Sequence, residues 1–208
     1  MPDHTSPDFS APASEERIQR AAAALREHNI ETIVVDTGAE AKQAVLERIP
    51  DGAEVHSAAS KSLQATGIQA ELEASPRVTW LRNQLKTMDR KTQAREIRKL
   101  GAAPDVMLGS VSAVTEDGRL VTASNSGSQL GPYAATAGKV ILVIGGQKVV
   151  KDLDEALRRV YEHALPLESE RLRAALGVDS GVSTILITNR DPRPGRLTAI
   201  LVREPLGF

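Results

Sequence analysis

K-V-I-L-V-I-G-G-Q-K, residues 139–148, is the stretch that decides the fold class of this 208-residue chain. Its first six residues are an almost unbroken apolar run, which predicts a central strand of a parallel sheet covered on both faces. Gly145 and Gly146 then permit close backbone approach to a ligand at the carboxyl end of that strand. Gln147 and Lys148 follow, so we predict either a ligand-binding loop or a tight turn with an exposed lysine.

Strand and helix patterns alternate on both sides of this stretch. Short apolar runs predict strands at 30–35, 53–57, 105–110, 183–188 and 197–202. Amphipathic patterns predict helices that begin at Ser14 and at Leu63 and span 39–49, 82–100, 152–164 and 168–176. Residues 112–124 read as a hairpin that turns at Asp117-Gly118. The alternation predicts an α/β domain with a largely parallel sheet, to which the hairpin adds antiparallel strands.

The sequence predicts one domain with a short tail. Residues 1–13 hold three prolines and no periodic pattern, which is typical of a disordered tail. Residues 14–208 contain no internal repeat and no internal linker. We therefore expect a single domain over residues 14–208.

Composition excludes several classes of function. The net charge is −1 and aromatic residues are scarce, so nucleic acid is not an expected partner. The chain has no cysteine, which removes disulfides, thiolate catalysis and cysteine-ligated iron–sulfur clusters. Its four histidines are widely spaced, so no metal site and no resident cofactor are expected. No apolar run is long enough to span a membrane, and a cytoplasmic location is expected.

Two further loops fit the place where strand ends meet helix starts in a parallel sheet. The first is S-A-A-S-K-S, residues 57–62, in which Ser57, Ser60 and Lys61 could bind an anion. The alternative there is a serine-capped helix. The second loop is rich in hydroxyls and amides, and its glycine can adopt positive φ. Its predicted ligand-binding residues are Ser124, Asn125, Ser126, Gly127, Ser128 and Gln129.

Glu116 is the candidate catalytic carboxylate, because it lies near the tip of the predicted hairpin, where a flap could cover a site. A solvated turn residue is the alternative. No G-x-S-x-G, G-x-G-x-x-G or Walker motif is present, which argues against a serine hydrolase, a dinucleotide site and a P-loop. Seven basic residues mark the helix predicted over 82–100. That pattern is typical of a solvated face, or of a docking surface for a partner protein.

The sequence resembles the LUD (lactate utilisation) domain family, in its stand-alone branch. The stretches that carry the resemblance are M-L-G-S-V-S-A-V-T-E-D-G-R-L-V-T-A-S-N-S-G-S-Q-L (107–130), K-V-I-L-V-I-G-G-Q-K-V-V-K-D-L-D-E-A-L-R-R (139–159), L-P-L-E-S-E-R (165–171) and L-T-A-I-L-V-R-E-P-L-G-F (197–208). The resemblance implies a three-layer α/β/α, Rossmann-like fold of the isomerase and CoA-transferase type. It also implies a link to the oxidation of lactate to pyruvate, beside iron–sulfur partner proteins.

Three functions follow as hypotheses. The first is an accessory protein of lactate utilisation that binds a small organic anion, either a carboxylate or a phosphate-bearing metabolite. The second is an isomerase- or transferase-type enzyme acting on a phosphorylated sugar, a CoA ester or a folate. The third is an assembly protein that docks through the basic helix. A homodimer is the expected oligomer, as the commonest default.

Overall fold

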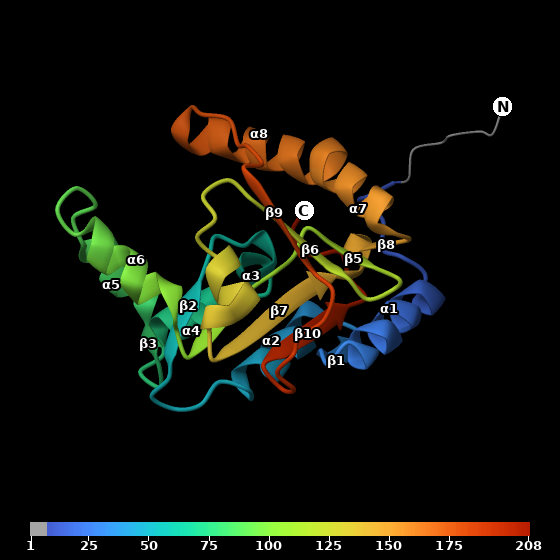
Figure 1. The fold of residues 1–208 in the computed structure, drawn as a ribbon, viewed down its shortest axis with the longest axis horizontal. Coiled ribbons are helices and arrows are strands. Elements are labelled where there is room, and N and C mark those ends of the chain that lie inside the picture. The colour runs from blue at the N-terminus through green and yellow to red at the C-terminus, as the bar shows by residue number, and fades with distance from the viewer. Residues whose placement is uncertain (1–7) are drawn as a thin grey trace.

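A six-stranded parallel sheet forms the centre of the computed structural model, which describes residues 8–208 (Figure 1). Its strands, in spatial order, are β1 (Glu31–Val35), β10 (Leu197–Val202), β7 (Lys139–Gly145), β4 (Val106–Gly109), β2 (Glu54–Ser57) and β3 (Thr79–Trp80). Every neighbouring pair is parallel. β7 lies in the middle of the sheet, which confirms the prediction made from its apolar run.

Helices cover both faces of this sheet, because successive side chains of its strands point to opposite sides. Val140, Leu142 and Ile144 of β7 pack in one core with α1 (Glu15–Glu27). Ile141 and Val143 pack in a second core on the other face. The helices of that face are α2 (Gly38–Leu46), α3 (Lys61–Ala65) and α4 (Ile68–Ala74). The three-layer α/β/α prediction is confirmed.

A second, four-stranded sheet lies against the α1 face of the first. Its order is β8 (Val149–Val150), β5 (Ala113–Thr115), β6 (Leu120–Ser124) and β9 (Thr184–Thr188). β5 and β6 form the predicted hairpin, and Gly118 at its turn has φ of 82°. Val114 faces the large sheet, whereas Val121 faces a third core beneath α7 (Leu153–Arg159). A π-helical turn (Val160–Ala164) continues α7 into α8 (Leu165–Leu176).

The last six residues of the predicted tail pack against the domain. Residues 1–7 of that prediction lie outside the described residues. Phe9, in contrast, is buried in the third core, and the backbone N–H of Ala13 donates to the carbonyl of Gly146. Residues 8–13 therefore pack against the domain, because the aromatic side chain of Phe9 gives this short segment enough apolar surface to bury.

The basic helix predicted over 82–100 is two helices, α5 (Leu81–Thr87) and α6 (Ala94–Ala102). Asp89 breaks it. Its carboxylate accepts hydrogen bonds from the Lys91 backbone N–H and the Thr92 hydroxyl, a turn that competes with helix. α6 has no fully buried residue, and Ile97 is only half-buried. Figure 1 shows the pair projecting from the domain.

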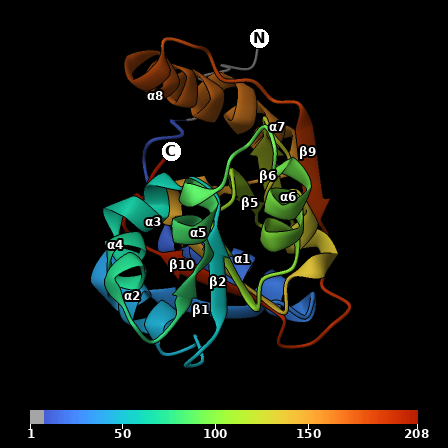
Figure 2. The ribbon, with the colours of Figure 1, turned by 90° about the vertical axis from the view of Figure 1, so that its left-hand side faces the viewer.

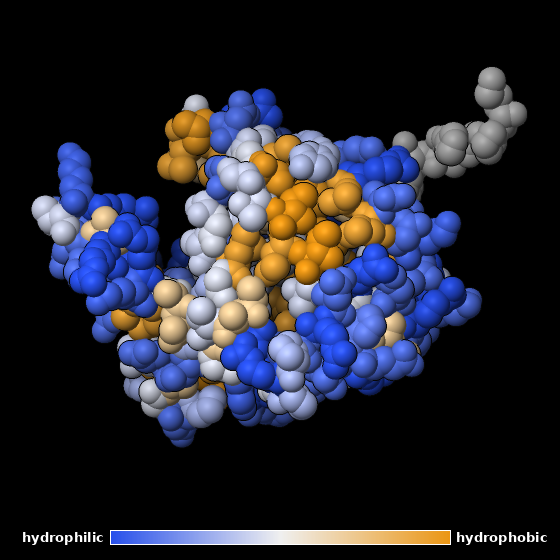
Figure 3. Space-filling model, viewed as in Figure 1, coloured by the Kyte–Doolittle hydropathy of each residue, from blue (hydrophilic) through white to orange (hydrophobic). Residues whose placement is uncertain are grey.

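β9 is an edge strand of the small sheet, and apolar surface lies along it. Ile187 of β9 is exposed, as are Leu176 and Val178 near the end of α8. Figure 3 shows apolar side chains gathered on this face of the molecule.

The homodimer expected from the sequence stays a prediction. In the part of the chain that the structure describes, no helix is both long and apolar enough to cross a membrane.

Candidate functional site

A cavity of about 400 Å³ lies at the carboxyl ends of three neighbouring parallel strands. β7 is followed by Lys148, β4 by Ser110, and β2 by the loop that contains Ser60 and Lys61. All four residues line the cavity. Residues of α8 line it as well, and both views show this helix above the C-terminal edge of the strands (Figures 1 and 2). The position agrees with the general rule that ligands of parallel α/β sheets bind outside the carboxyl ends of the strands.

The structure brings the three predicted loops to this one cavity. Eight of the predicted ligand-binding residues line it, namely Ser60, Lys61, Ser124, Asn125, Ser126, Ser128, Gln129 and Lys148. Ser60 also caps α3, since its hydroxyl accepts a hydrogen bond from the Leu63 backbone N–H at 3.3 Å. The serine-capped helix and the cavity wall are thus compatible roles for the same residue.

Lys148 is the most unusual side chain of the cavity, because it is a buried amine that forms no ion pair with a carboxylate among residues 8–208. Only 3% of the residue is exposed, so it is not the exposed turn lysine of the alternative reading. Its Nζ donates to Ser62 Oγ at 3.1 Å and to Ser110 Oγ at 3.0 Å. Burial lowers the pKa of Lys148 to about 7, and the nearby charge of Arg159 adds to this effect. Near neutral pH the amine therefore exists in both protonation states.

Arg159 does not line the cavity but connects three segments of the chain near it. Its side chain is fully buried and donates to three backbone carbonyls, of Ser112 (2.5 Å), Gln147 (3.1 Å) and Phe9 (3.4 Å). Burial lowers the pKa of Arg159 to about 10, so the guanidinium stays charged at neutral pH. It joins the N-terminal segment, the small sheet and the loop that carries Lys148.

The charges of the cavity favour an anion. Three basic residues line it, Lys61, Lys148 and Arg171, against one acidic side chain, Glu168, so the cavity has a net positive charge. Arg171 pairs with Glu168 through two hydrogen bonds, at 2.5 and 2.7 Å. Among residues 8–208, no three His, Cys, Asp or Glu side chains gather in a way that could hold a metal ion.

The loop after β6 is held in shape by its own hydrogen bonds. The hydroxyl of Ser124 accepts from the Gly127 backbone N–H at 2.9 Å and donates to Gln129 Oε1 at 3.0 Å. Gly127 has φ of 73°, as expected for its place in a tight turn. The exposed hydroxyls of Ser126 and Ser128 lie 3.2 Å apart on the cavity wall. The Ser126 hydroxyl donates to Ser128 and the Ser128 hydroxyl donates to Gln129 Oε1 at 3.4 Å, so each would exchange that hydrogen bond to donate to a ligand.

The family comparison agrees with this architecture. The family model of the LUD domain matches residues 18–202. The chain belongs to the LUD domain family. A crystal structure of a DUF162 family protein from Deinococcus radiodurans is similar in fold, with a TM-score of 0.52 and 13% sequence identity over 92% of this chain and 99% of that one. No match was found among curated proteins.

Five predicted ligand-binding residues of this LUD domain lie outside the cavity lining: Ser57, Gly127, Gly145, Gly146 and Gln147. Gln147 instead fixes the C-terminal segment, because its side chain accepts from the Leu206 backbone N–H and donates to the Gly207 carbonyl, both at 3.1 Å. A Cβ on Gly145 would lie 2.4 Å from the Leu206 nitrogen. The two glycines were predicted to permit close approach of a ligand, whereas in the structure the chain's own backbone approaches them closely.

We expect Gly145→Ala to lower the free energy of unfolding by about 1–3 kcal/mol, since a backbone segment must move to admit the methyl group. Gly127→Ala is the comparison, because no atom lies within 4 Å of its added Cβ and only the positive φ is strained. It should cost about 1 kcal/mol. Urea denaturation measures both. No loss of stability in Gly145→Ala would show that Gly145 is not required by packing.

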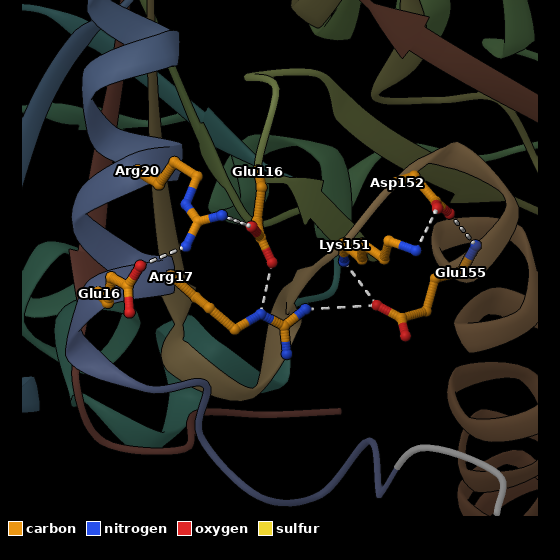
Figure 4. Close-up of polar contacts among 7 residues, drawn as sticks. All are labelled: Glu16, Arg17, Arg20, Glu116, Lys151, Asp152 and Glu155. Carbon is orange, nitrogen blue, oxygen red and sulfur yellow. Dashed lines mark hydrogen bonds and ion pairs between the residues drawn. The ribbon is translucent and has the colours of Figure 1, made fainter.

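Glu116 does not line the cavity. Its carboxylate forms ion pairs with Arg17 at 2.5 Å and Arg20 at 3.1 Å, both on α1 (Figure 4). Arg17 also reaches Glu155 of α7, at 3.4 Å. Gly118 at the hairpin tip packs on the backbone of α1. These contacts fix the hairpin against α1, so it is not a flap over the cavity. This position argues against the catalytic role expected for Glu116.

Several lining residues of the LUD domain were missed by sequence reasoning. Ser62 and Ser110 contact Lys148, and Tyr133 donates to the Ser110 carbonyl at 3.3 Å. Ser110 could have been found, because it directly follows a buried parallel strand. Arg171 lies on an amphipathic helix far along the chain, and nothing in its local pattern distinguishes it from a solvated arginine.

Proposed function

We propose that this LUD-domain protein binds a small organic anion, most simply the carboxylate of lactate or pyruvate, in the cavity around Lys148. The proposed role is that of an accessory component of lactate utilisation, working beside iron–sulfur proteins. Membership of the LUD family supports the metabolic context, and the cavity supports the chemistry of the ligand.

The observation that carries the proposal is the buried amine of Lys148, which has hydroxyl neighbours and no carboxylate among the described residues. A buried ammonium without a counter-ion is costly, and a bound anion would supply the missing charge. The hydroxyls of Ser62 and Ser110 fix the position of Nζ in the empty protein. Ligand binding should therefore cost little conformational entropy of the Lys148 side chain. One buried amine in a cavity with a small net positive charge suits a carboxylate better than a highly charged phosphate ester or CoA.

Binding should depend on pH in a defined direction. The carboxylate binds the ammonium form of Lys148, whose pKa is about 7 in the empty protein. Affinity should therefore be highest below pH 7 and fall as the amine loses its proton above it. The ligand's charge favours the protonated form, so binding near neutral pH should take up a proton.

Thermal unfolding against a metabolite panel tests the proposal. The panel comprises lactate, pyruvate, sugar phosphates, CoA esters, folates and nucleotides. A ligand at about a hundred times its dissociation constant adds roughly 2.7 kcal/mol of stability, a shift of several degrees. We expect the small carboxylates to give that shift in the wild type and in Lys151→Met, an exposed lysine outside the cavity. Lys148→Met should give none.

Other outcomes would decide against the proposal. A shift that Lys148→Met retains would place the ligand elsewhere. A shift given only by phosphate or CoA compounds would favour the transferase or isomerase hypothesis. No shift with any compound would favour a protein partner, which co-purification would then identify.

A further inference from the structure

The environment of Lys148 Nζ suits a chemical step as well as binding. The amine lines a cavity large enough for a small metabolite, yet the rest of the residue is buried. Its two hydrogen-bond partners are hydroxyls, which can both accept from an ammonium and donate to an amine lone pair. No carboxylate among residues 8–208 forms an ion pair with it to hold the proton.

The surroundings also favour the neutral, nucleophilic form of this amine. Burial lowers the pKa of Lys148 to about 7, and the charged Arg159 acts in the same direction. Desolvation and a neighbouring cation are the two means by which lysines become nucleophiles for carbonyl compounds. At neutral pH an ordinary lysine is almost entirely protonated, whereas about half of Lys148 is not.

We propose that Lys148 forms an imine with the carbonyl group of a small 2-oxo acid bound in the cavity. The inference rests on the proposed function, since the same cavity must first bind the acid. Lys61 and Arg171 line this cavity too, so the carboxylate can be bound by a cation other than the reacting amine. A 2-hydroxy acid such as lactate has no carbonyl and would bind without reacting.

The atoms of the step balance without an oxidant or reductant. The Nζ lone pair attacks the carbonyl carbon, a C–N bond forms, and the former carbonyl oxygen takes up a proton to give a carbinolamine. Loss of that oxygen as water, with release of a proton from nitrogen, forms the C=N bond. Ser62 and Ser110 hydrogen-bond Nζ at 3.1 and 3.0 Å, so their hydroxyls can pass the proton from nitrogen towards oxygen.

Reductive trapping tests the imine. The protein is incubated with pyruvate and sodium cyanoborohydride at about pH 7, digested, and each lysine peptide is assayed by mass spectrometry for one carboxyethyl group. We expect labelling of Lys148 to exceed that of Lys151 by at least about tenfold, because burial favours the neutral, nucleophilic amine at Lys148, whereas Lys151 lies exposed outside the cavity. Lys148→Met should abolish the label and Lys151→Met should leave it unchanged.

Lys148→Arg separates reaction from binding, because arginine keeps the charge but forms no imine under these conditions. Thermal shifts with lactate and pyruvate are measured on the same samples. A pyruvate shift without a Lys148 adduct would overturn the imine and leave the proposed function standing. Equal labelling of Lys148 and Lys151 would also overturn it. No shift and no adduct would overturn both proposals.

Discussion

Lys148→Met should make the protein more stable, by about 2–4 kcal/mol at about pH 6, while it abolishes anion binding. Methionine fills a similar volume without a charge to desolvate. The native state no longer needs to hold a buried ammonium whose pKa is far below the ordinary value of a lysine. The loss of the two hydrogen bonds from Nζ should cost little stability. Ser62 and Ser110 lose one partner each, but their hydroxyls lie 3.3 Å apart and can bond to each other. Urea denaturation of both proteins measures the difference.

The gain should depend on pH. Between about pH 7 and 10.5, Lys148 is neutral in the native state but still protonated in the unfolded chain. The unfolded state then binds more protons, so the wild type gains stability as pH rises through this window. The advantage of Lys148→Met should be full below about pH 7 and vanish towards pH 10.5. A difference that stays constant with pH would contradict a lowered pKa, and Lys151→Met is the matched control.

Arg159→Met should lower the free energy of unfolding by about 3–5 kcal/mol, on the order of 10 °C in melting temperature. The substitution leaves the buried carbonyls of Phe9, Ser112 and Gln147 without their donor. Buried polar groups that lose a charged partner lose its hydrogen bonds and remain desolvated. Thermal and urea denaturation measure the loss.

Arg158→Met is the matched control for Arg159, because Arg158 precedes it on the same helix and pairs with Glu162 at the surface. It should change stability far less. Since the Arg159 charge also lowers the pKa of Lys148, Arg159→Met should move the pH midpoint of carboxylate binding upward. A stability loss no larger than that of Arg158→Met would show that the hydrogen bonds of Arg159 do not hold the three segments together.

The sheet and the three loops that border the cavity could be predicted from sequence because their signals are local. The apolar run of β7 and the Asp117-Gly118 turn need no information from distant residues. Lys148 could be placed at a strand end for the same reason. Only its partners, Ser62 and Ser110, which lie 86 and 38 residues away, turn it into a buried amine.

The features that could not be predicted depend on contacts between distant residues for the same reason. Glu116 resembled a free carboxylate because its partner Arg17 is 99 residues away in the chain. Arg159 lay within a predicted amphipathic helix, where an arginine is normally solvated, and only the packing of three segments buries it. The break at Asp89 was in principle readable, since aspartate favours turns, but the helical pattern on both sides outweighed it.

Calorimetric titration of lactate into the wild type and into Lys148→Met tests the central claim most directly, because lactate cannot form the imine. We expect saturable one-site binding at about pH 6, at least about tenfold weaker binding at about pH 9, and no binding to Lys148→Met. Binding of equal strength in the two proteins, or binding that is the same at both pH values, would contradict it.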